Sequence, residues 1–353
     1  MSIRWPQLAR PALLALGISI FVWLVWRADL DEFLVHLGAL GPGAVLAAAP
    51  YALVVALAVL GWRSAFDRPV PLGSGRLALI HLAGKAVNLV TPLVPVGGEP
   101  LKAYLLRARG VPLTQGLASV VITKTLDAIA QVLFVVAATA FLVVRADVPA
   151  ALLTVTLPAM ATSAALVAGF VLAQWRGLFG GLARLLGSVG FGRASLDVGA
   201  RDLDRRIRAY YRQRRRRLVT ALTLHLLSWL ATSVEVWVLL ALLDLPRSIG
   251  FALGLAALTA AARFLAFAVP GAVGVQEGAT VFVFSTFGLP AGAALAFSVL
   301  RRFRELAWAA AGLVVLTGLR LDPAGSPAEG CAVELTLAGP PAIDARERMS
   351  HEG

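Results

Sequence analysis

Several apolar stretches in this chain approach or exceed the length that a helix needs to cross a membrane. A helix crosses the hydrocarbon core with about 20 residues. Stretches of roughly this length occur at 11–26, 42–61, 112–144, 149–173, 218–243 and 290–319. Of the 353 residues, 59% are hydrophobic and 15% are charged, whereas soluble domains carry about 25% charged residues. A soluble domain would have to bury all of these stretches, so we expect an all-α polytopic membrane protein.

Positive charge is concentrated in one segment. Residues 174–217 contain twelve arginines and three aspartates, a net charge of +9 out of +12 for the chain. Because basic loops beside membrane spans stay in the cytoplasm, we expect a basic cytoplasmic loop that contains an amphipathic helix around 195–217 and contacts anionic lipid headgroups. RNA binding is the alternative, but no aromatic stacking set accompanies the arginines. We therefore expect no nucleic-acid partner.

The remaining arginines predict the orientation of the chain. Arg4 and Arg10 precede the first apolar stretch, and Arg320 follows the last one, so both termini are expected in the cytoplasm. Residues 321–353 are rich in Pro, Gly, Ala and charge, a composition typical of disorder. We expect a transmembrane domain over 1–320 and a disordered cytoplasmic tail over 321–353.

Two further apolar stretches, 77–109 and 251–288, are interrupted by proline and glycine. The breaks contain Pro92, Pro95, Gly97, Gly98, Pro270, Gly271, Gly274 and Gly278. Arginines flank 77–109 on both sides, which favours a re-entrant helical hairpin that returns to the same face. A single kinked span is the alternative.

The chain also repeats itself at an offset of 178 residues. This offset aligns Lys85 with Arg263, Pro92 with Pro270, Glu99 with Glu277, Gly110 with Gly288, Pro112 with Pro290, Lys124 with Arg302 and Asp127 with Glu305. Lys102, Arg107 and Arg109 have no basic counterparts, and we expect them at the cytoplasmic mouth of the first hairpin. Three spans separate the hairpins, so the two copies should be inverted. We expect inverted repeats over 11–144 and 149–319, each with spanning helices and one broken hairpin, as in many secondary transporters.

Ionisable residues lie within these apolar stretches. They are Lys85, Glu99, Lys124, Asp127, Arg263, Glu277, Arg301, Arg302, Arg304 and Glu305. Each costs about 2.5–3.5 kcal/mol at the bilayer centre, so they should face one another or a wet cavity. Lys124 and Asp127 lie three residues apart, as do Arg302 and Glu305, and each pair shares a helix face.

Pairing across the breaks is expected as well, between Lys85 and Glu99 and between Arg263 and Glu277. Arg301 and Arg304 have no acidic counterpart of their own in the sequence pattern. Glu235 is a candidate for proton coupling, with a simple pair to Arg263 or His225 as the alternative.

These charges have two interpretations. They could clamp the hairpins as ion pairs without touching a substrate. Alternatively, half-helices that begin near Gly98 and Gln276 point their N-termini at the midplane, where they favour an anion such as a phosphate headgroup. His81 and His225 have no second ligand at metal spacing, and no nucleotide loop or nucleophile elbow occurs. We expect no metal, no cofactor and no enzymatic activity.

Three stretches carry a resemblance to a known family. They are Asn88–Arg107 (NLVTPLVPVGGEPLKAYLLR), Val269–Gly278 (VPGAVGVQEG) and Leu300–Leu306 (LRRFREL). They resemble the lysylphosphatidylglycerol synthase transmembrane-region family, also called flippase-like domain proteins, over roughly residues 10–320. With Leu224–Leu240, the second stretch resembles the hopanoid-biosynthesis-associated membrane protein L branch.

The resemblance implies a protein of the bacterial cytoplasmic (inner) membrane. In the multiple peptide resistance factors of this family, the region is held to flip an aminoacylated phospholipid beside a soluble aminoacyl-transferase domain. The tail at 321–353 is too short for such a domain, so aminoacyl transfer is not expected.

We therefore expect an inner-membrane lipid translocase or lipid-binding protein. Its partners would be membrane lipids, with anionic phospholipid headgroups, hopanoids and polyprenyl lipids as candidates. A subunit of a lipid-modifying complex and a small-solute secondary transporter are the alternatives. The sequence predicts no particular oligomeric state.

Overall fold

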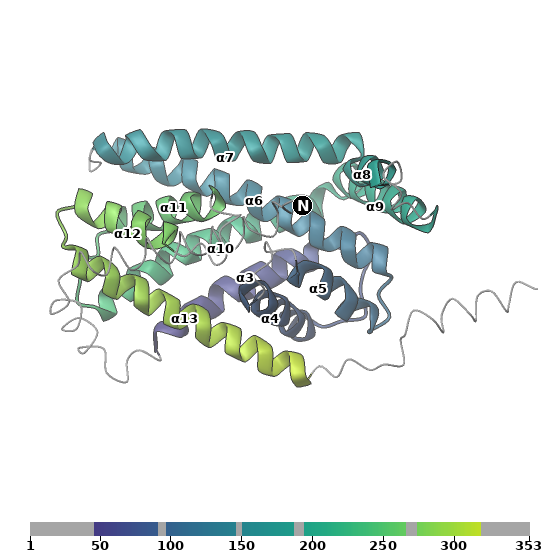
Figure 1. Ribbon diagram of the computed structural model, residues 1–353, viewed down its shortest axis with the longest axis horizontal. Helices are drawn as coiled ribbons and strands as arrows, with labels where there is room; N and C mark the ends of the chain where they lie inside the picture. Colours follow the sequence, from purple (N-terminus) through teal and green to yellow (C-terminus); the bar gives the residue numbers. More distant parts are fainter. Residues whose placement is uncertain (1–45, 91–96, 146–149, 187–193, 266–273, 319–353) are drawn as a thin grey trace, which may run out of the picture. The chain divides into compact units, whose positions relative to one another are not determined.

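The computed structural model describes residues 46–90, 97–145, 150–186, 194–265 and 274–318. Within these ranges the chain forms eleven helices and no strand (Figure 1). The all-α fold class is thereby confirmed. The expected span at 11–26, the break residues Pro92, Pro95, Pro270 and Gly271, and the tail at 321–353 lie outside the described residues.

The helices follow one another with short connections. In chain order they are α3 (Tyr51–Ser64), α4 (Ser74–Val90), α5 (Gly98–Arg107), α6 (Leu113–Val144), α7 (Ala150–Arg176), α8 (Leu178–Leu186), α9 (Ala194–Gln213), α10 (Arg215–Leu242), α11 (Ile249–Leu265), α12 (Val275–Thr286) and α13 (Ala291–Gly318).

Within the part of the chain that the structure describes, four helical stretches are long and apolar enough to cross a membrane. They are Leu46–Ser64, Leu113–Val144, Leu153–Arg176 and Arg215–Leu242. They coincide with four of the six predicted spans. The helix predicted at 290–319 is present as α13, which is 28 residues long. It carries the basic cluster at 301–304 in its middle, so its passage through the membrane stays a prediction.

Helix α7 has exposed apolar side chains along its length. Its side chains Leu157, Leu166 and Leu172 are exposed, and the helix runs along one edge of the view in Figure 1. Exposure of so many large apolar side chains is unfavourable in water. It is the surface expected of a helix in contact with lipid.

Each interrupted segment folds back on itself. A Cβ on Gly84 of α4 would lie 2.5 Å from Cε of Lys102 and 2.9 Å from the carbonyl oxygen of Gly98, both in α5. In the second segment, Phe251 near the start of α11 meets Phe284 near the end of α12, with ring centroids 5.2 Å apart. The two helices of each pair therefore lie side by side, as a hairpin requires and a kinked span does not allow. Their orientation in the membrane stays a prediction.

The two halves of the fold correspond at the predicted offset. Helices α6 and α13 begin at Leu113 and Ala291, and Gly110 and Gly288 precede them with φ of 80° and 71°. A positive φ is accessible to glycine without strain, which explains why glycine recurs there. Packing is reciprocal too, because α4 packs on α13 and its counterpart α11 packs on α6. The inverted orientation of the halves is a further step and stays a prediction.

The basic loop at 174–217 is helical over most of its described length. Helix α9 coincides with the predicted amphipathic helix around 195–217, although it ends at Gln213. Helix α8 was not anticipated by the sequence. Both lie between the candidate spans in α7 and α10.

Candidate functional site

Glu99 in the first turn of α5 is the centre of one charge cluster. Its carboxylate lies 3.0 Å from Nζ of Lys102 and 3.0 Å from Nζ of Lys124 on α6. Asn88 of α4 donates a hydrogen bond from Nδ2 to Oε1 of Glu99 at 3.1 Å. Three helices therefore meet at one acidic residue.

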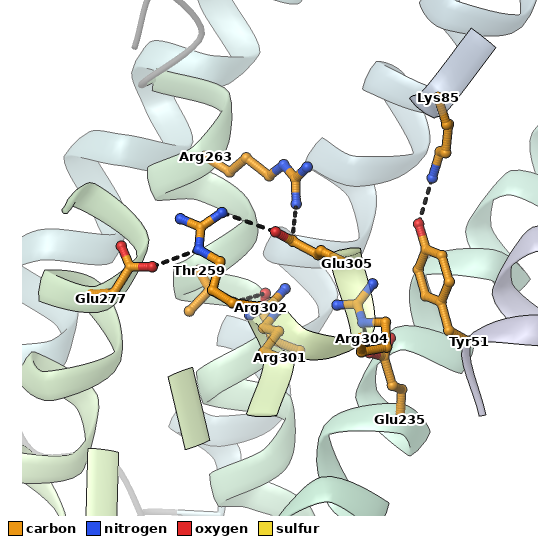
Figure 2. Close-up of polar contacts among 11 residues, drawn as sticks. Tyr51, Lys85, Glu235, Thr259, Arg263, Glu277, Arg301, Arg302, Arg304 and Glu305 are labelled. Carbon is orange, nitrogen blue, oxygen red and sulfur yellow. Dashed lines mark hydrogen bonds and ion pairs between the residues drawn. The ribbon is translucent and has the colours of Figure 1, made fainter. Parts of the chain in front are cut away.

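Arg302 on α13 is the centre of the corresponding cluster in the second half. Its Nε donates to Glu277 on α12 at 2.8 Å, and its Nη1 donates to Glu305 at 2.9 Å. Arg263 on α11 donates to the other oxygen of Glu305 at 3.0 Å (Figure 2). The Glu277–Arg302 pair is the repeat counterpart of the Glu99–Lys124 pair.

The expected pair between Arg302 and Glu305 is therefore present, but the pairs expected across the two breaks are not. Lys85 donates to the hydroxyl of Tyr51 at 2.5 Å, while Glu99 is held by the two other lysines. Arg263 contacts Glu305 rather than Glu277. In both halves the acid after the break pairs with a base on the long helix that follows the hairpin, α6 or α13. The reason is that this helix packs directly against the hairpin.

Asp127 also differs from the expectation. It accepts a hydrogen bond from Nε1 of Trp229 at 3.2 Å, and Nδ1 of His225 lies 3.7 Å away. The ion pair of Lys124 is with Glu99 instead of Asp127.

Arg301 and Arg304 have partners that the sequence pattern did not indicate. Arg301 donates to Oγ1 of Thr259 at 3.0 Å. Nε of Arg304 lies 2.9 Å from Glu235, although the atoms are not aligned for a hydrogen bond. Arg304 is thus the counter-ion of Glu235, in place of the expected Arg263 or His225.

Tyr51 joins Lys85 of the first half to Arg304 of the second. The guanidinium of Arg304 lies 4.2 Å from the centroid of the Tyr51 ring, and the hydroxyl of Tyr51 accepts from Lys85 (Figure 2). A tyrosine beside two cations supplies both a π face and an acceptor. Nothing in its sequence neighbourhood marks this residue.

Lys102 was expected at a cytoplasmic mouth, but it is buried. Its side chain is 3% exposed and points at Glu99. The sequence signal for this pair was the spacing of three residues between Glu99 and Lys102 on one helix. Arg107, in contrast, is exposed, and Arg109, just beyond the end of α5, donates to the carbonyl of Leu105.

The N-termini of the half-helices are occupied by the protein's own side chains. The N–H of Gly98 donates to Oδ1 of Asn88 at 2.7 Å, and the N–H of Gly274 donates to Oε2 of Glu277 at 2.7 Å. Gly97 precedes the first of these helices, and Gly278 lies in the first turn of the second. An incoming anion would therefore meet basic side chains rather than free helix ends.

The ion-pair network combines seven basic and five acidic residues. The basic ones are Lys85, Lys102, Lys124, Arg263, Arg301, Arg302 and Arg304; the acidic ones are Glu99, Asp127, Glu235, Glu277 and Glu305. Five of these residues are buried, namely Lys102, Glu235, Glu277, Arg301 and Arg304. Lys124 and Arg263 are 48% and 50% exposed, Lys85 is exposed as well, and the side chain of Asp127 is 39% exposed. The network therefore has more bases than acids and presents three cations at its surface. Among the described residues, no group of three His, Cys, Asp or Glu side chains could hold a metal ion.

Fold and network together define an α-helical membrane protein with broken hairpins and a buried ion-pair network. The family model described as lysylphosphatidylglycerol synthase TM region matches residues 12–312, and the chain belongs to this family. No curated protein and no solved structure matches it.

Proposed function

We propose that this protein binds an amphiphilic lipid with an anionic headgroup and moves it between the leaflets of the membrane. The observation that carries the proposal is the group of three exposed cations, Lys85, Lys124 and Arg263, on an ion-pair network in which bases outnumber acids. In an apolar environment an excess of positive charge needs a counter-ion. A phosphate headgroup supplies one, and its acyl or isoprenoid chains would remain in the bilayer.

The network can accept such a guest without leaving a buried acid unpaired. Glu305 has two basic partners, Arg263 and Arg302, and Glu99 has Lys102 and Lys124. If Arg263 or Lys124 turned to a headgroup, each carboxylate would keep one cation. Unpaired buried charges cost several kcal/mol, so this redundancy supports exchange of partners during binding.

The same pairing speaks against an enzyme. Acid–base chemistry on a lipid would need two carboxylates with different protonation states at one place. Glu99, Glu277 and Glu305 are all held in ion pairs by lysine or arginine, which argues against acid–base catalysis by any of them. We therefore propose a transporter or binding protein rather than a catalyst.

The location follows the same reasoning. We propose a multi-pass protein of the bacterial inner membrane with both termini in the cytoplasm and the two halves inverted. The basic segment between α7 and α10 supports this orientation through the positive-inside rule. Hopanoids, polyprenyl-linked lipids and anionic phospholipids all belong to the proposed class of substrate.

Reconstitution into vesicles tests the proposal. Headgroup-labelled phosphatidylglycerol is added to phosphatidylcholine vesicles that contain the protein, and the label in the outer leaflet is quenched with dithionite. We expect rapid transbilayer exchange with the wild-type chain and roughly ten-fold slower exchange after Lys124→Gln with Arg263→Gln, because two charge-assisted contacts are lost. Arg205→Gln, at an exposed position on α9, should leave the rate unchanged.

Two results would contradict the proposal. Exchange no faster than in protein-free vesicles would exclude translocation of this lipid class, provided that native lipids extracted with the protein and identified by mass spectrometry also fail to exchange. Equal rates for the wild-type chain and the double variant would exclude the site. Uptake of a soluble anion into the vesicles without lipid exchange would support the small-solute transporter instead.

A further inference from the structure

A second cationic site lies away from the ion-pair network. A cavity of about 430 Å³ lies where the end of α7 meets α8 and α9. Four arginines line it, Arg176, Arg184, Arg201 and Arg208, together with Asp204. All four arginines are exposed. Its volume is within the usual range for ligand pockets, about 300–1,000 Å³.

The carboxylate that lines the cavity accepts hydrogen bonds from backbone groups. Asp204 is buried, and its two oxygens accept from the N–H of Gly180 at 2.7 Å and from the N–H of Phe179 at 3.2 Å. It therefore caps the N-terminus of α8. A Cβ on Gly180 would lie 3.1 Å from Asp204, so glycine permits this close contact.

Two of the arginines are positioned by hydrogen bonds from their side chains to backbone carbonyls. Nε of Arg184 donates to the carbonyl of Gly180 at 3.2 Å, and Nε of Arg208 donates to the carbonyl of Asp204 at 3.3 Å. Both side chains are held near the cavity through one nitrogen. Guanidinium groups offer several further donors each and match the geometry of phosphate oxygens.

Neighbouring apolar side chains place the cavity at a membrane surface. The candidate span in α7 ends at Arg176 and the next one begins at Arg215, so α8 and α9 lie between two spans. On α8, Leu182 and Leu185 are 49% and 63% exposed, and Trp175 at the end of α7 is exposed too. An amphipathic helix with exposed leucines beside arginines is typical of one that lies in the lipid interface.

We propose that this cavity binds the phosphate of an anionic phospholipid headgroup from the adjacent leaflet. The leucines of α8 enter the acyl region while the four arginines meet the headgroup layer. The site does not depend on the proposed transport activity, because it shares no residue with the ion-pair network.

Binding to the full-length protein in nanodiscs tests the proposal. The affinity of spin-labelled phosphatidylglycerol is measured in phosphatidylcholine nanodiscs. One double variant combines Arg184→Gln with Arg201→Gln, and the control double variant combines Arg205→Gln with Arg216→Gln. The control removes the same charge from positions outside the cavity. We expect a roughly ten-fold greater loss of affinity in the cavity variant than in the control, since bidentate contacts exceed general attraction to the surface.

Competition separates the possible sources of phosphate. Inorganic phosphate or glycerol 3-phosphate at millimolar concentration should not displace the lipid, because neither can use the exposed leucines. Displacement by either would replace the lipid with a free phosphate as the ligand and overturn the proposal. Equal losses in the two double variants, or displacement of the lipid by single-stranded RNA, would overturn it as well.

A measurement on the wild-type chain avoids any effect of the substitutions on folding. Phosphatidylglycerol with a photoreactive headgroup is cross-linked in the nanodiscs, and the modified peptides are identified by mass spectrometry. Labelling of the α8–α9 peptides, reduced by excess unlabelled phosphatidylglycerol but not by phosphatidylcholine, is expected. Labelling that both lipids reduce equally would contradict a headgroup-specific site.

Discussion

The contacts of Glu99 lead to an asymmetric prediction about stability. Its two lysine partners differ in solvent access, because the side chain of Lys102 is 3% exposed and that of Lys124 is 48% exposed. Glu99→Gln would leave Lys102 without an anion in a buried position, whereas Lys124 could turn to water or headgroups. Removing one partner of a buried pair costs about 3–5 kcal/mol. The loss corresponds to a decrease in Tm of roughly 6–20 °C on the scale of soluble domains.

Removing the buried lysine should change the stability far less. Lys102→Met leaves Glu99 paired with Lys124 and hydrogen-bonded by Asn88, so we expect a change within about 1 kcal/mol. Combining Glu99→Gln with Lys102→Met should recover at least about 2 kcal/mol of the loss caused by Glu99→Gln alone.

Thermal unfolding in detergent, followed by the fluorescence of buried tryptophans, measures all three variants. Arg205→Gln, whose side chain is 74% exposed, serves as the control and should change Tm by little. If Lys102→Met destabilised the protein as much as Glu99→Gln, or if the double variant were no more stable than Glu99→Gln, the assignment of Lys102 as the dependent partner would be wrong.

Three further predictions follow from local contacts. Gly98→Ala should lower stability by about 1–3 kcal/mol because the new Cβ would overlap the backbone of α4, while Gly75→Ala, with open space around it, should be neutral or stabilising by Tm. Asp204→Ala removes the cap of α8 and should cost about 1–2 kcal/mol, seen as faster trypsin cleavage within α8; unchanged cleavage would speak against the cap. The hydrogen bond from Arg206 lowers the pKa of Asp202, so its stabilising contribution is present above the ordinary aspartate value of about 3.9 and is lost as the pH falls below it. The difference in Tm between the wild-type chain and Asp202→Asn should therefore shrink as the pH falls below that value, and a difference that stays constant would contradict the assignment.

The helices could be predicted because membrane length and helix breakers leave direct marks in sequence. Four spans and the broken character of 77–109 and 251–288 agree with the structure. Helix α8 was missed because its nine residues are too short for a span and lie within an arginine-rich loop. The surrounding arginines made its apolar face hard to recognise in the sequence.

The partners of the charged residues were harder to predict. Spacing within one helix correctly indicates Arg302 with Glu305, because residues three apart share a face. It cannot show which side chains of different helices meet, and Glu99 with Lys124 depends on how α5 packs on α6. Tyr51 and Thr259 escaped notice because neither carries a charge.

The contacts also show which interactions belong to one half of the fold and which join the two. Glu99 with Lys124 and Glu277 with Arg302 each lie within one half. Tyr51, in contrast, contacts Lys85 of its own half and Arg304 of the other, and α4 packs on α13 as α6 packs on α11. If one half rocks against the other, as halves of repeat-built transporters do, the acid–base pairs can move as intact units. The contacts of Tyr51 must then change, as must those of Asp127 with His225 and Trp229, because both sets span the two halves.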